Sequence, residues 1–318
     1  LLEASGYYTG FTGKGVDPFQ YARNDQDTLW RKGNAAGHPF NKYKYEKNIS
    51  SDLRTAKGIG LTNYYENFRS FMQQRKDGQP FYFWYGATEP HRVYEKGSWK
   101  RNGKSLDQVD VPGFLPDSEE VRGDMLDYAV EIEWADSHLS KMLEYLDSIG
   151  ELNNTIVIVT ADNGMPFPRA KANCFEYGVH VPFAVSYPKG FPGKRRVDDP
   201  ISFVDIAPTI LEIAGVKPDG MLPISGRSFM NILKSKKEGI VDQSKKYVYM
   251  GRERHSSSRW QNLGYPQRAV RNQDYLLIWN LRPERWPAGA PQMLNKKTGE
   301  LCPMYGIGED GTFHPDWA

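Results

Sequence analysis

Asp162 and Asn163 offer the hard side-chain oxygens that Ca²⁺ and Mg²⁺ prefer in proteins. They follow residues 156–159, an unbroken run of β-branched side chains that is typical of a buried parallel strand. Ligand sites of open α/β sheets form at this end of a strand. Gly164 lets the backbone turn sharply beneath the two side chains. Because Asp-Asn-Gly is also common turn chemistry, these residues alone leave a metal site and a plain turn both open.

Two further predicted strand ends carry side chains that could act on an anion. Residues 7–15 are predicted to form a strand that ends in Lys14, whose flanking glycines would let its ammonium approach an anion close to the backbone. Residues 80–86 form another apolar run, which leads into His91 and Arg92. An imidazole can act as acid or base near neutral pH, and a guanidinium recognises sulfate or carboxylate by its planar fork. A solvated lysine and a structural histidine are the plainer alternatives.

A long helix is predicted between these strand ends, over residues 118–149. Its apolar side chains recur at alternating steps of four and three, which gives one continuous stripe for packing on a sheet. Glu131, Glu133 and Asp136 are expected on its solvated face. A shorter helix is predicted over residues 61–76, from its aromatic side chains at helical spacing.

The two apolar runs are expected to be parallel strands of one mixed sheet, over residues 80–85 and 155–160, with the long helix packed across it. This arrangement would place His91 and Asp162 at the same edge of the sheet. A further strand is predicted over residues 182–187.

A helix is predicted over residues 202–215, with Pro208 in its first turn and Gly215 at its end. The adjacent acids Asp198 and Asp199 lie in a basic loop bounded by proline, and we expect both on the surface.

The chain changes character near residue 236. Short strands are predicted over residues 247–250, 268–271 and 275–279. We therefore expect an α/β domain over residues 1–235, with a mostly parallel sheet flanked by helices, and a small subdomain over residues 236–318 with an antiparallel sheet.

Composition narrows the classes of function. The 318 residues carry a formal net charge of only +2, which argues against a nucleic-acid partner bound through a broad basic surface. No apolar run approaches the length of a membrane span. The two cysteines, Cys174 and Cys302, make no disulfide framework and lack zinc-site spacing.

The combined pattern resembles the sulfatase family, most closely its sulfamidase-like branch. The matching segments are ADNGMPFPRAK with the following Glu176 and Val-Pro pair, GYYTGFTGKG, and a strand followed by PHR. The resemblance implies an alkaline-phosphatase-like fold and a residue-by-residue set of roles. These are a Ca²⁺ site (Mg²⁺ possible) at Asp162 and Asn163, catalytic roles for Lys14, His91 and Lys171, and substrate contacts by Arg92, His255 and Arg268.

The sequence departs from the family pattern at two places. Family members attack with a formylglycine made from the Cys or Ser of a Cys/Ser-x-Pro-x-Arg motif, and neither Cys174 nor Cys302 nor any serine begins that motif. We therefore expect the formylglycine, and the family's amino-terminal metal-binding Asp pair, upstream of Leu1. Many relatives have a catalytic histidine two residues after the lysine that corresponds to Lys14, where this chain has Val16.

The resemblance implies hydrolysis of a sulfate ester or N-sulfate on a sulfated sugar, with N-sulfoglucosamine favoured and the 318-residue chain incomplete and inactive. Two alternatives stay open, a phosphoesterase or phosphonate hydrolase of the same fold and a non-catalytic glycan-binding relative. The expected partner is a sulfated saccharide, with no nucleic acid and no membrane span. The expected location is periplasmic or secreted, or lysosomal in an animal.

Overall fold

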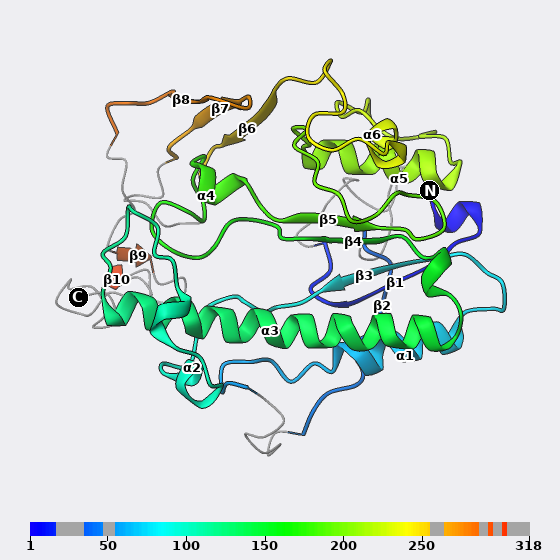
Figure 1. The fold of residues 1–318 in the computed structure, drawn as a ribbon, viewed down its shortest axis with the longest axis horizontal. Coiled ribbons are helices and arrows are strands. Elements are labelled where there is room, and N and C mark those ends of the chain that lie inside the picture. Colours follow the sequence, from blue (N-terminus) through cyan, green and yellow to red (C-terminus); the bar gives the residue numbers. More distant parts are fainter. Residues whose placement is uncertain (17–34, 47–54, 255–263, 286–291, 295–300, 304–318) are drawn as a thin grey trace.

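The computed structural model describes residues 1–16, 35–46, 55–254, 264–285, 292–294 and 301–303. Its first sheet is parallel, with the order β2-β1-β3. β1 (Tyr8–Gly13) lies between β2 (His38–Pro39) and β3 (Phe81–Gly86) (Figure 1). The register pairs Gly13 with Gly86, so β1 and β3 end at the same level. The residues that follow these two strands therefore leave the sheet side by side.

β4 (Val157–Thr160) pairs with β5 (Phe183–Ser186) in a separate, antiparallel two-stranded sheet. The prediction that β3 and β4 share one mixed sheet is therefore wrong, as is the prediction that β4 is a buried parallel strand. The apolar run made β4 a strand, but its ladder partner in the described residues is β5, and Val159 is exposed. β3 and β4 nevertheless run in the same direction (Figure 1), and α3 (Glu119–Ser148) lies along both.

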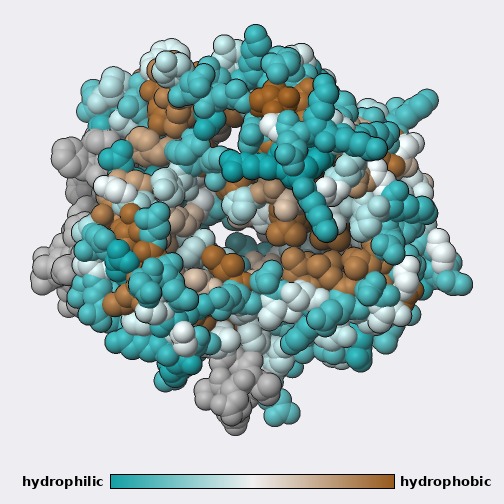
Figure 2. All heavy atoms as spheres, viewed as in Figure 1, coloured by the Kyte–Doolittle hydropathy of each residue, from teal (hydrophilic) through white to brown (hydrophobic). Residues whose placement is uncertain are grey.

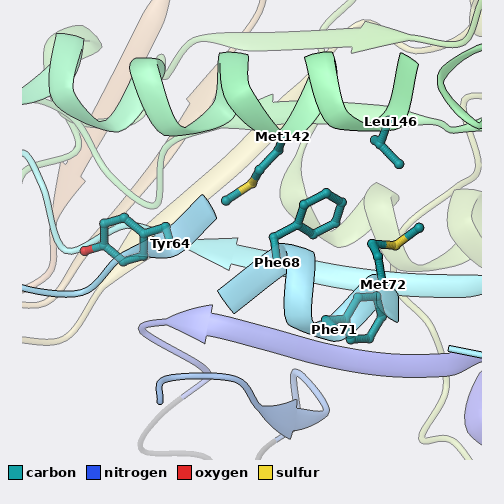
Figure 3. Close-up of a cluster of buried hydrophobic side chains, with 6 residues drawn as sticks. All are labelled: Tyr64, Phe68, Phe71, Met72, Met142 and Leu146. Atoms are coloured by element: carbon teal, nitrogen blue, oxygen red, sulfur yellow. The ribbon is translucent and has the colours of Figure 1, made fainter. Parts of the chain in front are cut away.

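α1 (Tyr64–Gln74) and α3 bury the main core against the first sheet. Phe68, Phe71 and Met72 of α1 lie between Met142 and Leu146 of α3 and the strands (Figure 3). α1 begins at Asn63, whose side-chain oxygen accepts a hydrogen bond from the backbone N–H of Glu66, a standard N-cap. The predicted helices over 61–76 and 118–149 are thereby confirmed.

The buried face of α3 is rotated from the predicted one. Ile132 is exposed, whereas Glu131 and His138 are fully buried, so the expectation that Glu131 is solvated is wrong. The reason is that the helix is covered on two sides, by α1 and by the segment that contains Ala56 and Ile59. The apolar spacing of α3 alone does not predict the contact with the segment around Ala56. α2 (Ser98–Arg101) also packs against α3.

The other sheet is covered by α5 (Ile206–Ala214) and α6 (Met230–Lys234), whose apolar side chains pack against Phe183 and Val185 of β5. Asp199 is buried here, and its carboxylate accepts hydrogen bonds from the backbone N–H groups of Val241 and Asp242 at 2.7 and 2.6 Å. The expectation that Asp199 lies on the surface is therefore wrong, because two backbone donors compensate for its burial.

The last strands form antiparallel sheets. β6 (Val248–Arg252), β7 (Gln267–Arg271) and β8 (Leu276–Asn280) make one, in that order, and β9 (Gln292–Leu294) pairs with β10 (Leu301–Pro303). The three strands predicted in this region are confirmed, whereas the domain boundary near residue 236 stays a prediction. No helix in the described ranges combines the length and hydrophobicity that a membrane crossing requires.

Candidate active site

Lys14 follows directly on β1 and is held against the end of β3. Its N–H donates to the Gly86 carbonyl oxygen at 2.6 Å. Gly13, with φ of 76°, makes this turn, and a Cβ there would lie 2.1 Å from the Gly86 oxygen. Asn41 fixes the same turn by accepting from the Gly13 N–H at 2.7 Å and donating to the Gly13 carbonyl at 3.2 Å. The Lys14 side chain is exposed at this end of the sheet.

Glu89 anchors the loop after β3 to the start of α1 and to the segment before it. Its carboxylate accepts from the Tyr64 hydroxyl at 2.7 Å and from the Gly60 N–H at 2.8 Å. Burial, and then the charge of Glu89, raise the pKa of the Tyr64 hydroxyl, which keeps it a donor. His91 lies above this anchor with an exposed ring, whose Nδ1 is 2.7 Å from the Arg92 carbonyl oxygen. Nε2 has no hydrogen-bond partner among the described residues.

Arg92 joins three parts of the molecule. Its guanidinium makes a two-pronged ion pair with Asp124 of α3, with Nη1 3.0 Å from Oδ1 and Nη2 in contact with Oδ2. Its Nε donates to the Pro166 carbonyl oxygen at 3.2 Å, and its guanidinium carbon lies 5.0 Å from the centre of the Phe167 ring. All three guanidinium nitrogens of Arg92 therefore have protein partners, although the sequence had suggested that they bind substrate.

The loop after β4 carries Asp162, Asn163 and Lys171. The Asp162 carboxylate is exposed. The Asn163 Nδ2 donates to the Gly164 carbonyl at 2.7 Å, which leaves its Oδ1 without a partner in the described part of the chain. The Lys171 N–H donates to the Met165 carbonyl at 3.0 Å and closes the loop on itself.

Gly164 packs directly on α4 (Glu176–Val179), the short helix that follows this loop. Its N–H donates to the Gly178 carbonyl oxygen at 3.1 Å, and a Cβ there would lie 1.8 Å from the Tyr177 oxygen. The turn beneath Asp162 and Asn163 is therefore built for glycine.

Two arginines of the β6-β7-β8 sheet hold the far side of the same loop. Arg252 Nη1 donates to the Asn173 side-chain oxygen at 3.2 Å. Arg271 makes a two-pronged ion pair with Glu176 of α4, with both contacts at 2.9 Å. Hydrogen bonds from Arg271 are the main cause that lowers the pKa of Glu176. The loop is thus tied to the carboxyl-terminal sheet at two points.

The two remaining predicted substrate contacts are less central. Arg268 is half-exposed on β7 and pairs with Glu253, while its Nη1 also donates to the Gln267 carbonyl at 2.8 Å. His255 lies outside the described residues.

The loops that carry the predicted residues leave the strands at one end of the molecule. Lys14 and His91 follow the paired strands β1 and β3, and Arg92 connects their loop to the loop of Asp162 and Lys171. Figure 2, drawn in the same view as Figure 1, shows a hollow near the centre of the molecule. The three loops carry two lysines, a histidine and an aspartate, residue types suited to an oxyanion and its leaving group.

Sequence reasoning missed the residues that support this arrangement, chiefly Asn41, Asp124 and Arg271. Each acts through a contact distant in sequence, 28 residues for Asn41 with Gly13, 32 for Asp124 with Arg92 and 95 for Arg271 with Glu176. Glu176 was the one available signal. It follows Lys171 in the matched motif, and an acidic residue at that place could have indicated a basic partner.

The residues present make only part of a calcium site. Asp162 and Asn163 supply one carboxylate and one amide oxygen, whereas Ca²⁺ takes about six to eight oxygen ligands. No group of three His, Cys, Asp or Glu side chains suited to a metal occurs within the described ranges. The described residues therefore do not complete a metal site.

Two family models match the chain. The model described as sulfatase matches residues 1–216, and the model described as N-sulphoglucosamine sulphohydrolase, C-terminal, matches residues 170–287. The chain belongs to the sulfatase family, as its motifs predicted.

Curated relatives support the same placement. An ulvan-active sulfatase of Formosa agariphila is 26% identical over 67% of this chain and 39% of its own length. The human N-sulphoglucosamine sulphohydrolase is 26% identical over 88% of this chain and 56% of its own length. The chain thus spans about half the length of these relatives.

Solved structures confirm the predicted fold class. A protein bound to its substrate D-glucosamine-2-N,6-O-disulfate has a TM-score of 0.56 at 18% identity, covering 87% of this chain and 71% of that one. The phosphonate monoester hydrolase of Agrobacterium radiobacter has a TM-score of 0.59 at 15% identity, covering 88% and 72%. At these identities the likeness concerns the fold alone.

Proposed function

We propose that this chain forms the anion-binding and leaving-group side of a sulfatase site that acts on a sulfated sugar, with N-sulfoglucosamine favoured. The observation that carries the proposal is the convergence of the loops after β1, β3 and β4, linked by Arg92 through its bond to Pro166. The match of residues 170–287 to the N-sulphoglucosamine sulphohydrolase C-terminal model supports the choice of sugar.

Each residue has a role that its chemistry allows. Lys14 and Lys171 would stabilise negative charge on the sulfate oxygens. His91 would give a proton to the departing amine or alcohol, since its exposed ring has Nε2 free to face a ligand. Arg92 would act as a positioning residue through Asp124 and Pro166.

Calcium (or magnesium) and formylglycine belong to the proposal as family features. A bound Ca²⁺ would polarise the sulfate. Asp162 and Asn163 would hold it only together with ligands that the described residues do not provide. The sequence also lacks the motif from which formylglycine is made. A periplasmic, secreted or lysosomal location is part of the same proposal.

Binding and turnover test the proposal separately. Titration calorimetry with N-sulfoglucosamine should show binding that Lys171→Ala weakens about tenfold or more, as expected for loss of a charge-assisted contact. Lys236→Ala is the matched control, because Lys236 is an exposed lysine in the segment after α6. Equal affinity of both variants and the parent chain would contradict the assignment of Lys171.

Release of sulfate from N-sulfoglucosamine and from an O-sulfated glucosamine, beside release of phosphate from a phosphate ester, separates the classes. Sulfate release would support the sulfatase class, but release by the 318 residues alone would contradict the expectation that they lack the nucleophile. Preferred turnover of the phosphate ester would favour the phosphoesterase alternative. The phosphonate monoester hydrolase has the same fold, so the fold does not separate the two classes. Sugar binding without any turnover would fit a glycan-binding protein, or a site whose nucleophile lies outside the 318 residues.

A further inference from the structure

Four buried polar side-chain atoms without a partner lie on α3 and on the segment that covers it. They are Thr55 Oγ1, Glu131 Oε1, Trp134 Nε1 and His138 Nε2, from a total of five such side-chain atoms in the described ranges. Glu131, Trp134 and His138 share one face of α3 and are 2%, 6% and 0% exposed. Thr55 begins the segment that covers this face, through Ala56 and Ile59.

Packing contacts connect α3 with the covering segment around these atoms. The rings of Trp134 and His138 lie 5.0 Å apart, nearly perpendicular to each other. Trp134 belongs to the same buried cluster as Ala56, the residue next to Thr55. A Cβ at Gly58 would lie 3.3 Å from Glu131 Oε1, which places the carboxyl group against the same covering segment.

The protonation state of each group follows from its contacts. His138 Nδ1 accepts a hydrogen bond from the Tyr65 N–H at 3.2 Å, so the ring proton is on Nε2. Burial, followed by the charge of Lys141, lowers the pKa of His138 to about 4, which keeps the ring neutral. The Trp134 indole nitrogen is a donor only. The interface therefore presents two N–H donors, together with a carboxyl and a hydroxyl group that can both accept and donate.

This set of groups excludes most occupants. A cation would meet two N–H groups that cannot ligate it. An anion would meet the charges of the buried Glu89 and Asp127, which act on the Glu131 carboxyl group. An apolar filler would leave all four atoms unsatisfied, which is costly inside a protein. The remaining class is a small neutral molecule that both donates and accepts hydrogen bonds.

We propose that the interface between the segment 55–60 and α3 is an internal water site, in which ordered water accepts from Trp134 and His138 and donates to Glu131 and Thr55. Buried waters of this kind make about two to four hydrogen bonds to groups that would otherwise be unsatisfied. The site adjoins the candidate active site, because the same Gly58 Cβ position lies 2.5 Å from the carbonyl oxygen of Val93, the residue after Arg92. Gly58 of the covering segment thus packs against the loop that carries His91 and Arg92.

A crystal structure of the whole chain, at a resolution that shows ordered solvent, tests the proposal directly. We expect water within hydrogen-bonding distance of Trp134 Nε1 and His138 Nε2. Side chains that bond to one another across a dry interface, or an empty void, would overturn it.

Nuclear magnetic resonance gives an independent measurement in solution. The Trp134 indole proton should show a cross-relaxation signal with the sign of water that tumbles with the protein. Two indoles serve as controls: Trp84, which donates to the Lys14 carbonyl at 3.0 Å, and Trp279, which is exposed. A Trp134 signal with the same sign as the Trp279 signal would contradict a long-lived water.

Two substitutions at one position sharpen this test. Glu131→Gln keeps a polar partner and should keep the Trp134 water signal, whereas Glu131→Leu should lose it. If Glu131→Leu fails to fold, the parent chain and Glu131→Gln still decide the question. Retention of the signal in a folded Glu131→Leu variant would remove Glu131 from the site.

Discussion

Gly164 holds the loop that carries Asp162 and Lys171 close to α4. Gly164 lies so close to α4 that a methyl group would overlap the Tyr177 carbonyl, which is rigid backbone rather than a flexible side chain. From the sequence, Gly164 is expected after Asp162 and Asn163 because a glycine allows a sharp turn. The structure adds a second reason, close packing, which depends on a helix that begins 12 residues later.

Gly164→Ala should therefore destabilise the protein by at least about 2 kcal/mol, because the loop must move away from α4. Thermal or urea unfolding measures the change. Gly193→Ala is the matched control, since a Cβ at Gly193 meets nothing within 4 Å, and it should be close to neutral. Equal stability of the two variants would show that the loop accommodates the methyl group.

Glu131 should make stability depend on pH. Burial raises its pKa from 4.5 to about 8, so the folded protein binds a proton that the unfolded chain has released. The stabilisation is complete below the unfolded pKa and is lost as pH rises from 4.5 to about 8. Glu131→Gln should flatten this slope in urea unfolding curves, whereas Glu133→Gln, a change on the exposed face, should not. A slope unchanged by Glu131→Gln would refute the assignment.

His138 acts in the opposite direction. Burial lowers its pKa from 6.5 to about 4, so the unfolded chain binds more protons within that range and stability falls as pH drops through it. The two slopes oppose each other between pH 4.5 and 6.5, so the two groups together predict a plateau of stability there and a decline above it. His138→Gln should remove the plateau, so that stability falls with rising pH from about 4.5, which the same unfolding curves would reveal. Loss of the slope on the alkaline side instead would point to another group.

At the scale of elements, most helices and strands could be predicted because their hydrophobic spacing is local information. The pairing of β4 could not. An apolar run indicates a strand and its burial, yet β4 pairs with β5 through residues such as Val185, which lies 27 positions from Ile158 and faces it in the register. The buried face of α3 was missed for a similar reason, because the segment around Ala56 covers it from a distance in sequence.

Arg92 is the element-scale link between α3 and the two loops of the candidate site. Arg92→Ala should cost about 1–3 kcal/mol, a range reduced from that of fully buried pairs because the Arg92 and Asp124 side chains are 25% and 13% exposed. Arg92→Lys should recover only part of the loss, since an ammonium cannot reproduce the two-pronged contact.

A double-mutant cycle with Asp124→Ala isolates the Arg92–Asp124 pair from the rest of the loop. We expect the two changes to be strongly non-additive in urea unfolding. Arg196→Ala is the control, because Arg196 is largely exposed in its pair with Asp198 and should contribute little. Additive effects of Arg92→Ala and Asp124→Ala would mean that the ion pair does not couple the two elements.

At the scale of the whole molecule, the outer face of the β6-β7-β8 sheet is unusually apolar. Tyr249 of β6 and Leu277 and Trp279 of β8 are 73%, 65% and 65% exposed. Leu277 and Trp279 alternate along β8 with the less exposed Ile278. An exposed apolar sheet face favours self-association. The chain should therefore form larger species at high concentration in light scattering, and the double change Leu277→Lys and Trp279→Lys should suppress them with little loss of stability. Ile278→Lys should instead destabilise the fold.

Three arginine contacts on the loop after β4 and on the helix that ends it have a consequence for how the loop would receive a ligand. Arg92 and Arg252 each fix a stretch of the loop, and Arg271 fixes α4 directly after it. A segment already held at three points has little conformational entropy left to lose. Anion binding at Lys171 should thus proceed as docking to a preformed receptor, with fast association and affinity governed by the rate of dissociation.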